Sequence, residues 1–197
     1  FAKAALKIGK NLFKQELDRY GFNKPLNFEQ NTDISVYGNI DSEAKLAVSG
    51  FGQGEMEVNP IFMAKIYSAF ANNGNAVTPY ILQKEGNDQN TVNSANLIKP
   101  LTANKIKNDL KKVIDEGTGK LAKIDGKNLY GKTGTAEIKM TKDDKSGEEI
   151  GWFNVFDDNK LLIVNMVENA KKLNGSKFSV KNLREVFDKY VIINNVN

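Results

Sequence analysis

Apolar residues recur at helical spacing in several stretches of the chain. The first predicted helix covers Ala2–Tyr20. Its apolar face is formed by Ala5, Ile8, Leu12 and Phe13. Gly21 follows this pattern, as glycine often does at a helix C-terminus. Four more segments show helical spacing or helix caps, and they are residues 42–49, 60–71, 102–114 and 180–191.

Three of these segments carry further signals. Asn59 and Pro60 are predicted to begin the second of these helices, and Asn72-Asn73-Gly74 to end it. Thr102 is predicted to cap the third helix, which the Gly117-Thr118-Gly119 turn ends. In the last helix, the side chains expected to point inward are Leu183, Val186, Phe187 and Tyr190.

A different pattern begins at residue 129. Three runs rich in apolar residues predict strands over Leu129–Lys139, Ile150–Phe156 and Leu161–Glu168. The charged segment Met140–Glu149 and a tight turn at 157–159 separate these runs, which is typical of hairpins. Because residues 161–164 are almost continuously apolar, we expect the third strand to be buried on both faces. Two polar stretches, 23–40 and 77–98, are predicted to be loops, the second with a weak hairpin. No repeat and no domain linker is evident.

The composition narrows the possible chemistry. The chain has 197 residues, of which 40% are hydrophobic and 26% charged, so it is long enough for a sizeable core. It contains no cysteine and no histidine, which excludes disulfides, Ser-His-Asp triads and His-based zinc sites. An enzyme of this composition must move protons with Lys, Asp, Glu, Tyr or water. We expect no metal and no cofactor.

The surface charge indicates no particular macromolecular partner. The net charge is +4, but the lysines are scattered among acidic residues, and no basic block is interleaved with aromatic residues. We therefore expect a solvated surface and no nucleic-acid partner. No apolar run reaches the length of about 20 residues that a membrane-spanning helix needs.

The most informative run is Lys132-Thr133-Gly134-Thr135, which lies in the first predicted strand. A lysine supplies a fixed positive charge, and threonine hydroxyls donate hydrogen bonds to a carboxylate. Glycine leaves room for a ligand or a neighbouring backbone to approach the strand. The alternative is an ordinary exposed strand, because Lys and Thr are common on strand surfaces.

Four other segments support the functional interpretation. They are Gly50–Pro60, Phe70–Gly74, Val113–Lys120 and Gly151–Phe153. With Lys-Thr-Gly they resemble, in order and spacing, the transpeptidase domain of class B penicillin-binding proteins. The details are most similar to the low-affinity, resistance-type group of Gram-positive bacteria. The resemblance implies an α+β fold: the C-terminal part of the penicillin-binding protein/serine β-lactamase-like fold, with three antiparallel strands of its sheet plus helices.

The resemblance also implies roles for individual residues. Lys132 would supply positive charge near the nucleophile and the substrate carboxylate. Thr133, Gly134 and Thr135 would form the substrate-binding strand, with both hydroxyls on the carboxylate. The Thr135 N–H would be one half of an oxyanion hole, which makes Lys132 and Thr135 the expected catalytic residues. The implied function is peptidoglycan D,D-transpeptidation through an acyl-serine, with stem peptides and β-lactam antibiotics as ligands.

The family's nucleophilic serine and its Ser-x-Asn motif are expected outside the chain, which opens on a helical pattern at Phe1. We therefore expect residues 1–197 to be a partial transpeptidase domain that is inactive alone and forms no penicillin adduct. Ser42-Glu43-Ala44-Lys45 and Ser94-Ala95-Asn96 imitate the two motifs. Both are rejected, because a weak nucleophile needs burial beside its activating lysine. Ser42 instead precedes a glycine-rich turn, and Ser94 lies in a polar stretch.

The resemblance implies a location and leaves two rival functions. The parent protein would act at the extracytoplasmic face of the bacterial cell membrane, anchored by a segment outside this chain. The apolar face at Ala5, Ile8 and Leu12 and one face of the sheet would be left uncovered, so the chain is expected either to self-associate or to come from a longer chain whose N-terminal half was cleaved off. A β-lactam sensor or binding module and a serine β-lactamase are the alternatives on the same fold.

Overall fold

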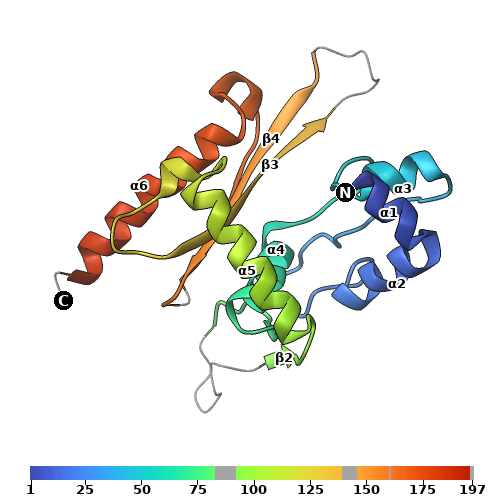
Figure 1. Cartoon of the computed structure of the whole chain (residues 1–197), viewed down its shortest axis with the longest axis horizontal. Helices are drawn as coiled ribbons and strands as arrows, with labels where there is room; N and C mark the ends of the chain where they lie inside the picture. Colours follow the sequence, from blue (N-terminus) through green and yellow to red (C-terminus); the bar gives the residue numbers. More distant parts are fainter. Residues whose placement is uncertain (83–91, 139–145, 160, 196–197) are drawn as a thin grey trace. The chain divides into compact units, whose positions relative to one another are not determined.

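The computed structural model describes residues 1–82, 92–138, 146–159 and 161–195 (Figure 1). These residues form two compact units. The first comprises Phe1–Ala69 and Gly74–Ile98, and the second Phe70–Asn73 and Lys99–Asn197. The chain changes unit three times, after Ala69 in the last turn of a helix, after Asn73, and after Ile98 directly before another helix, so no single linker marks the division.

The first unit is mainly helical. Its elements are α1 (Ala2–Ile8), α2 (Lys10–Tyr20), α3 (Glu43–Ser49), α4 (Pro60–Ala71), β1 (Ala76–Val77) and β2 (Val92–Ser94). The two short strands pair antiparallel, which confirms the weak hairpin. The core contains Phe22, Leu46 and Phe62, and the Phe22 and Phe62 rings meet edge to face at 4.8 Å. The predicted Asn59 cap is confirmed as well: the Phe62 N–H donates to Asn59 Oδ1 at 2.7 Å at the start of α4.

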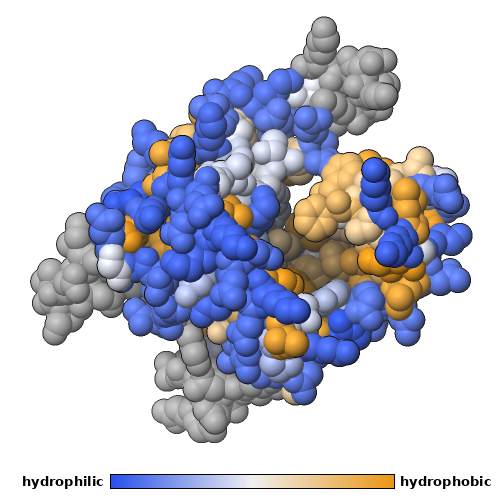
Figure 2. Space-filling model, viewed as in Figure 1, coloured by the Kyte–Doolittle hydropathy of each residue, from blue (hydrophilic) through white to orange (hydrophobic). Residues whose placement is uncertain are grey.

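The single helix predicted over residues 2–20 is wrong. Gly9 adopts φ 82°, which favours glycine, and divides the segment into α1 and α2. Only part of the predicted apolar face is uncovered, because Ala5 is buried while Ile8 and Leu12 are 48% and 50% exposed. Figure 2 shows apolar surface over this helical region.

The second unit holds the main sheet. Its elements are α5 (Pro100–Asp115), η1 (Lys120–Ala122), β3 (Leu129–Ile138), β4 (Glu148–Asp157), β5 (Leu162–Val167), η2 (Ala170–Leu173) and α6 (Ser176–Asn195). The strands lie in the order β3-β4-β5, all antiparallel (Figure 1). The fold is therefore α+β with three antiparallel strands, as predicted. Phe153 and Val155 of β4 pack with Leu183 and Phe187 of α6 in the core.

Two predictions about burial in this unit are wrong. The third strand was expected to be buried on both faces, but every residue of β5 is only half-buried, and the central strand β4 is the most buried. β5 pairs along one edge only among the described strands, which explains its exposure. Val186 of α6, expected to point inward with Leu183, Phe187 and Tyr190, is 47% exposed. The side chain of Tyr190 lies outside the described residues.

Helix and strand ends shift for local reasons. α5 begins at Pro100 and not at Thr102, because the fixed φ of proline and its missing N–H suit the first helical position. α6 begins at Ser176, four residues before the predicted start at 180. Most of the predicted charged loop, residues 140–145, lies outside the described part of the chain, as does residue 139 at the end of the predicted first strand, and β4 already begins at Glu148. Among the described residues, no helix combines the length and hydropathy needed to cross a membrane.

Candidate active site

The four predicted site residues lie on β3, which is an edge strand of the sheet among the described strands. In its register with β4, Lys132 lies opposite Asn154 and Thr133 opposite Phe153. Successive side chains of a strand point to opposite faces, so Lys132 and Gly134 share one face while Thr133 and Thr135 share the other. β3 pairs with β4 along one edge only among the described strands. A ligand at the other edge can therefore meet both faces.

Close packing explains glycine at two positions of β3. A Cβ atom at Gly131 would lie 2.8 Å from the backbone oxygen of Asn154. A Cβ atom at Gly134 would lie 3.3 Å from Cβ of Trp152, which is half-buried beside it. The contact at Gly131 is too short to exist, because the oxygen belongs to the backbone of the neighbouring strand. The contact at Gly134 is short but can be relieved by a small shift. Gly131 is thus required for the pairing of β3 with β4. Gly134, which has no side chain, leaves room for a ligand to approach the strand between the two threonines.

Thr133 has a hydroxyl partner that the sequence did not assign to the site. Its Oγ1 lies 2.6 Å from Oγ1 of Thr118, in the turn that follows α5. The sequence marked this Gly-Thr-Gly turn as the end of a helix and as part of the family resemblance, but gave Thr118 no role. The only signal for Thr118 in the sequence was a hydroxyl residue between two glycines after a helix. A hydrogen bond between side chains 15 positions apart leaves no pattern in the sequence.

Lys132 is exposed and held close to its own strand. Its Nζ donates to the backbone oxygen of Thr133 at 2.9 Å. One of the three ammonium donors is used by this bond, which leaves others for an anionic or hydroxyl group. This bond holds the Lys132 side chain along its own strand.

The turn before α6 lies close to Thr135. A Cβ atom at Gly175 would be 4.0 Å from Thr135 Oγ1 and 3.4 Å from Glu149 Oε2. Gly151, opposite Thr135 in β4, would meet the Gly175 oxygen at 3.2 Å if it carried a Cβ. The exposed Thr135 side chain is therefore bordered by two glycines, of which Gly175 lies in a turn that the sequence did not connect with the site.

The beginning of β3 is anchored to α5. The Tyr130 hydroxyl donates to Asp158 Oδ1 at 2.9 Å, and the Lys107 ammonium lies 3.0 Å from the same oxygen. Lys107 also lies over the Tyr130 ring, 4.3 Å from its centroid. Burial, and then the hydrogen bond to Asp158, raises the pKa of Tyr130 to about 12. Tyr130 is thus a neutral donor that fixes the strand leading to Lys132.

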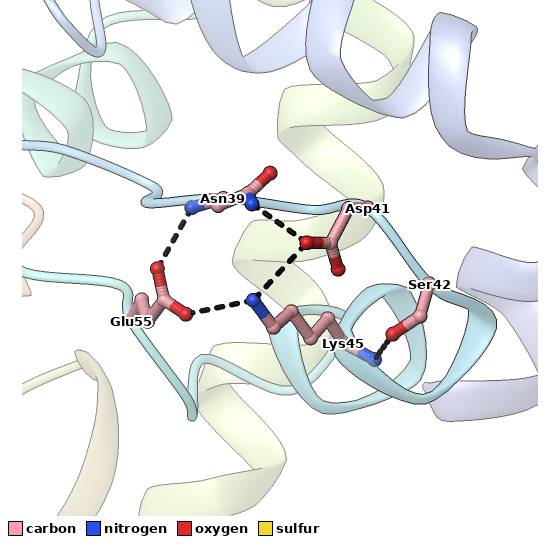
Figure 3. Close-up of polar contacts among 5 residues, drawn as sticks. All are labelled: Asn39, Asp41, Ser42, Lys45 and Glu55. Atoms are coloured by element: carbon pink, nitrogen blue, oxygen red, sulfur yellow. Dashed lines mark hydrogen bonds and ion pairs between the residues drawn. The ribbon is translucent and has the colours of Figure 1, made fainter.

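The rejected Ser42–Lys45 pair has a structural role. Ser42 caps α3, where its Oγ accepts the Lys45 backbone N–H at 3.3 Å (Figure 3). The Lys45 ammonium points toward Glu55 and Asp41, at 3.1 and 3.5 Å. The bond to Glu55 is the main cause that raises the pKa of Lys45, so this amine stays charged. Both side chains are exposed or half-exposed, and the charged amine cannot serve as a base for Ser42.

The same cluster holds the glycine-rich turn. The Asn39 N–H donates to Glu55 Oε2 at 2.9 Å, and this bond, followed by Lys45, lowers the pKa of Glu55 (Figure 3). Asn39 Nδ2 also donates to Asp41 at 2.7 Å. These contacts connect the end of the long loop, α3 and the turn before α4.

The second imitation of a family motif is likewise part of the scaffold. Ser94 pairs with Ala76 in the short hairpin. Asn96 has φ 53° and its N–H donates to Asn75 Oδ1 at 2.9 Å, which is the geometry of a turn. Among the described residues, no group of three or more acidic side chains is arranged to hold a metal ion.

Comparison with models of known protein families shows to which family the chain belongs. The family model for the penicillin-binding protein transpeptidase domain matches residues 1–189. The chain belongs to this family.

The alignments with two relatives from Bacillus subtilis (strain 168) extend over most of this transpeptidase chain. It is 34% identical to penicillin-binding protein 3 over 193 residues, which cover 95% of this chain and 29% of the relative. It is 31% identical to stage V sporulation protein D, over 84% of this chain and 28% of that protein. The chain thus spans less than a third of the length of these relatives.

Solved structures show the same fold. The ceftriaxone acyl-enzyme complex of penicillin-binding protein A from Mycobacterium tuberculosis has a TM-score of 0.80 at 21% identity, over 95% of this chain and 45% of that one. The D,D-transpeptidase domain of a peptidoglycan glycosyltransferase from Eggerthella lenta has a TM-score of 0.78 at 18% identity, over 100% of this chain and 51% of that one. Both matches place the three-stranded sheet and its helices in the transpeptidase fold.

Proposed function

We propose that this chain forms the Lys-Thr-Gly side of a peptidoglycan D,D-transpeptidase active site. The observation that carries the proposal is the run Lys132–Thr135 on a strand paired along one edge only among the described strands, with a second hydroxyl, Thr118, bonded to Thr133. The parent protein would acylate a serine with a stem peptide and pass the acyl group to the amine of a second strand. β-Lactams would acylate the same serine.

Each site residue has a distinct task in this reaction. The Lys132 ammonium provides positive charge at the serine and the substrate carboxylate. The hydroxyls of Thr133 and Thr135 bind the carboxylate, and Gly134 lets the ligand approach the strand. The Thr135 N–H donates to the oxyanion, and the loss of one such donor typically lowers the rate about 10²–10³-fold.

The nucleophile belongs to a segment outside these 197 residues. Support comes from the two candidates inside the chain, because Ser42 is an exposed helix cap and Ser94 lies in a short hairpin. By itself the chain is therefore a partial transpeptidase domain that is inactive and is not acylated. Uncovered apolar residues such as Ile8 and Leu12 support self-association of the isolated chain.

The finer assignment follows the sequence resemblance. We place the parent in the low-affinity, resistance-type class B group, at the extracytoplasmic face of the membrane with an anchor outside this chain. β-Lactam reactivity is supported by structural relatives, since penicillin-binding protein A from M. tuberculosis was solved as acyl-enzymes with ceftriaxone, imipenem and penicillin G.

Intact-mass spectrometry with benzylpenicillin tests the proposal. The chain alone should keep its mass, whereas a longer protein that includes the segment with the serine should gain one adduct. Lys132→Ala in that longer protein should slow the reaction, and Lys127→Ala, at a half-buried loop position before β3, is the matched control. An adduct on the isolated chain at Ser42 would overturn the assignment. Rapid release of the adduct would favour the β-lactamase alternative.

A further inference from the structure

The Thr118–Thr133 contact joins two hydroxyls that come from different elements. Their oxygens lie 2.6 Å apart, a short distance even for an O–H···O bond. Each hydroxyl has one proton to donate and two lone pairs to accept with. One proton lies between the two oxygens, so the other proton must point elsewhere. The direction of the shared bond therefore decides which threonine can donate to a ligand.

Thr118 is held by backbone bonds and not by a loose loop. The N–H of Gly117 donates to the Lys112 oxygen at 3.1 Å, and the N–H of Gly119 donates to the Val113 oxygen at 3.0 Å. A Cβ atom at Gly119 would lie 3.0 Å from Ile114 Cδ1 and 3.3 Å from the Phe153 ring. The turn is thus packed onto the end of α5 and the core beneath β3, which presents the Thr118 hydroxyl in a defined place.

We propose that Thr118 is a positioning residue that orients the Thr133 hydroxyl toward a ligand carboxylate. This inference rests on the proposed function, in which Thr133 binds that carboxylate. A carboxylate only accepts hydrogen bonds, so Thr133 must donate to it. Thr133 then has only lone pairs left for Thr118, and Thr118 becomes the donor of the shared bond. The resulting chain of bonds runs from Thr118 to Thr133 to the carboxylate.

The arrangement strengthens binding in two ways. A hydroxyl that accepts a bond becomes a better donor, since chains of hydrogen bonds polarise one another. The bond also restricts the Thr133 side chain to the rotamer in which its oxygen faces Thr118. Without Thr118 the Thr133 hydroxyl can still reach the ligand, but the ligand itself must then orient the hydroxyl.

The test uses the protein that carries this chain together with the segment supplying the serine. Thr118→Val removes the hydroxyl at nearly constant shape, and Thr118→Ser keeps it. Thr102→Val is the matched control, because Thr102 is an exposed threonine in the first turn of α5. Acylation rates are measured by intact mass with benzylpenicillin and with its methyl ester, in which the carboxylate is masked.

Thr118→Val should slow acylation by benzylpenicillin about 3- to 10-fold, the effect of one lost neutral hydrogen bond. Thr118→Ser should restore most of the rate, and Thr102→Val should have no effect. The methyl ester should react at the same rate with Thr118→Val as with the wild type. A purely structural defect would slow both compounds equally, and this result would overturn the inference, as would a normal rate with benzylpenicillin.

A second pair of variants separates this inference from the proposed function. Thr133→Val and Lys132→Ala should each slow acylation if the site on β3 is the active site. If both react like the wild type, the proposed function fails. If they are slowed and Thr118→Val is not, only the role of Thr118 is wrong.

Discussion

Replacing Gly131 by alanine tests whether the packing of β3 against β4 controls the stability of the second unit. The new Cβ would lie 2.8 Å from the Asn154 backbone oxygen and 3.2 Å from Cβ and Cγ2 of Val155. The oxygen belongs to the central strand and cannot rotate away. Relief therefore requires the two strands to separate locally, which lengthens the hydrogen bonds between them.

The magnitude follows from two opposing effects. Inserting a methyl group into a packed site typically costs about 1–3 kcal/mol. Alanine is favoured over glycine inside a strand by about 0.5–1 kcal/mol, because glycine loses more backbone entropy on folding. Gly131→Ala should therefore lower the free energy of unfolding by about 1–2 kcal/mol. In a protein of this size that corresponds to a fall in Tm of about 2–8 °C.

Gly134→Ala in the same strand is the matched control. Its Cβ would meet Trp152 Cβ at 3.3 Å, and the nearest other atoms belong to the same side chain, at 3.9 and 4.0 Å. Because the Trp152 Cβ position is fixed by its backbone, a backbone shift of a few tenths of an ångström relieves the contact, so the entropy gain and the packing cost should nearly cancel. Gly134→Ala should thus leave stability nearly unchanged.

Urea unfolding followed by fluorescence measures both variants. The chain has one tryptophan, Trp152 in β4, so the signal reports the sheet. The reasoning is refuted if Gly131→Ala unfolds at the wild-type urea concentration, or if Gly134→Ala loses more stability than Gly131→Ala.

Three further predictions concern polar groups around the two units. Asn154 Oδ1 is buried without a hydrogen-bond partner in the described structure, so Asn154→Leu should raise the free energy of unfolding by about 1 kcal/mol in the same urea assay, and a loss would show that the oxygen is satisfied. Asp158→Asn removes the carboxylate that accepts from Tyr130, so the pKa of Tyr130 should fall from about 12 toward its ordinary value. A tyrosine pKa that is higher in the folded than in the unfolded state stabilises the fold below pH 10, and this stabilisation is lost as the pH rises toward 12. Asp158→Asn should therefore lose less stability than the wild type between pH 10 and pH 12. NMR of ¹³Cζ-labelled tyrosine follows the titration, and an unchanged pKa would contradict the contact. Ser42→Ala should destabilise α3 by about 1 kcal/mol, measured by hydrogen exchange, and leave penicillin acylation of the longer protein unchanged. Loss of acylation would restore Ser42 as the nucleophile.

Local signals in the sequence determined most of the secondary structure. The Asn59 cap, the proline after it and the Asn-Asn-Gly stop defined α4 within a residue or two, because caps and turns depend on neighbours along the chain. The three strands were found for the same reason, since each apolar run is bounded by polar turns. The Lys-Thr-Gly residues were also found in the sequence, because they are contiguous and their family resemblance extends over the other segments.

Only the tertiary structure decided the features that depend on distant residues. The exposure of β5 follows from its place in the sheet, and a continuous apolar run cannot reveal whether a strand is central or outermost. The break at Gly9 lies inside an uninterrupted helical pattern, where glycine permits a left-handed φ without requiring it. The Thr118–Thr133 bond forms because the turn after α5 is packed onto the core beside β3. Periodicity records which side of an element is apolar, whereas hydrogen bonds between side chains of different elements depend on how those elements pack.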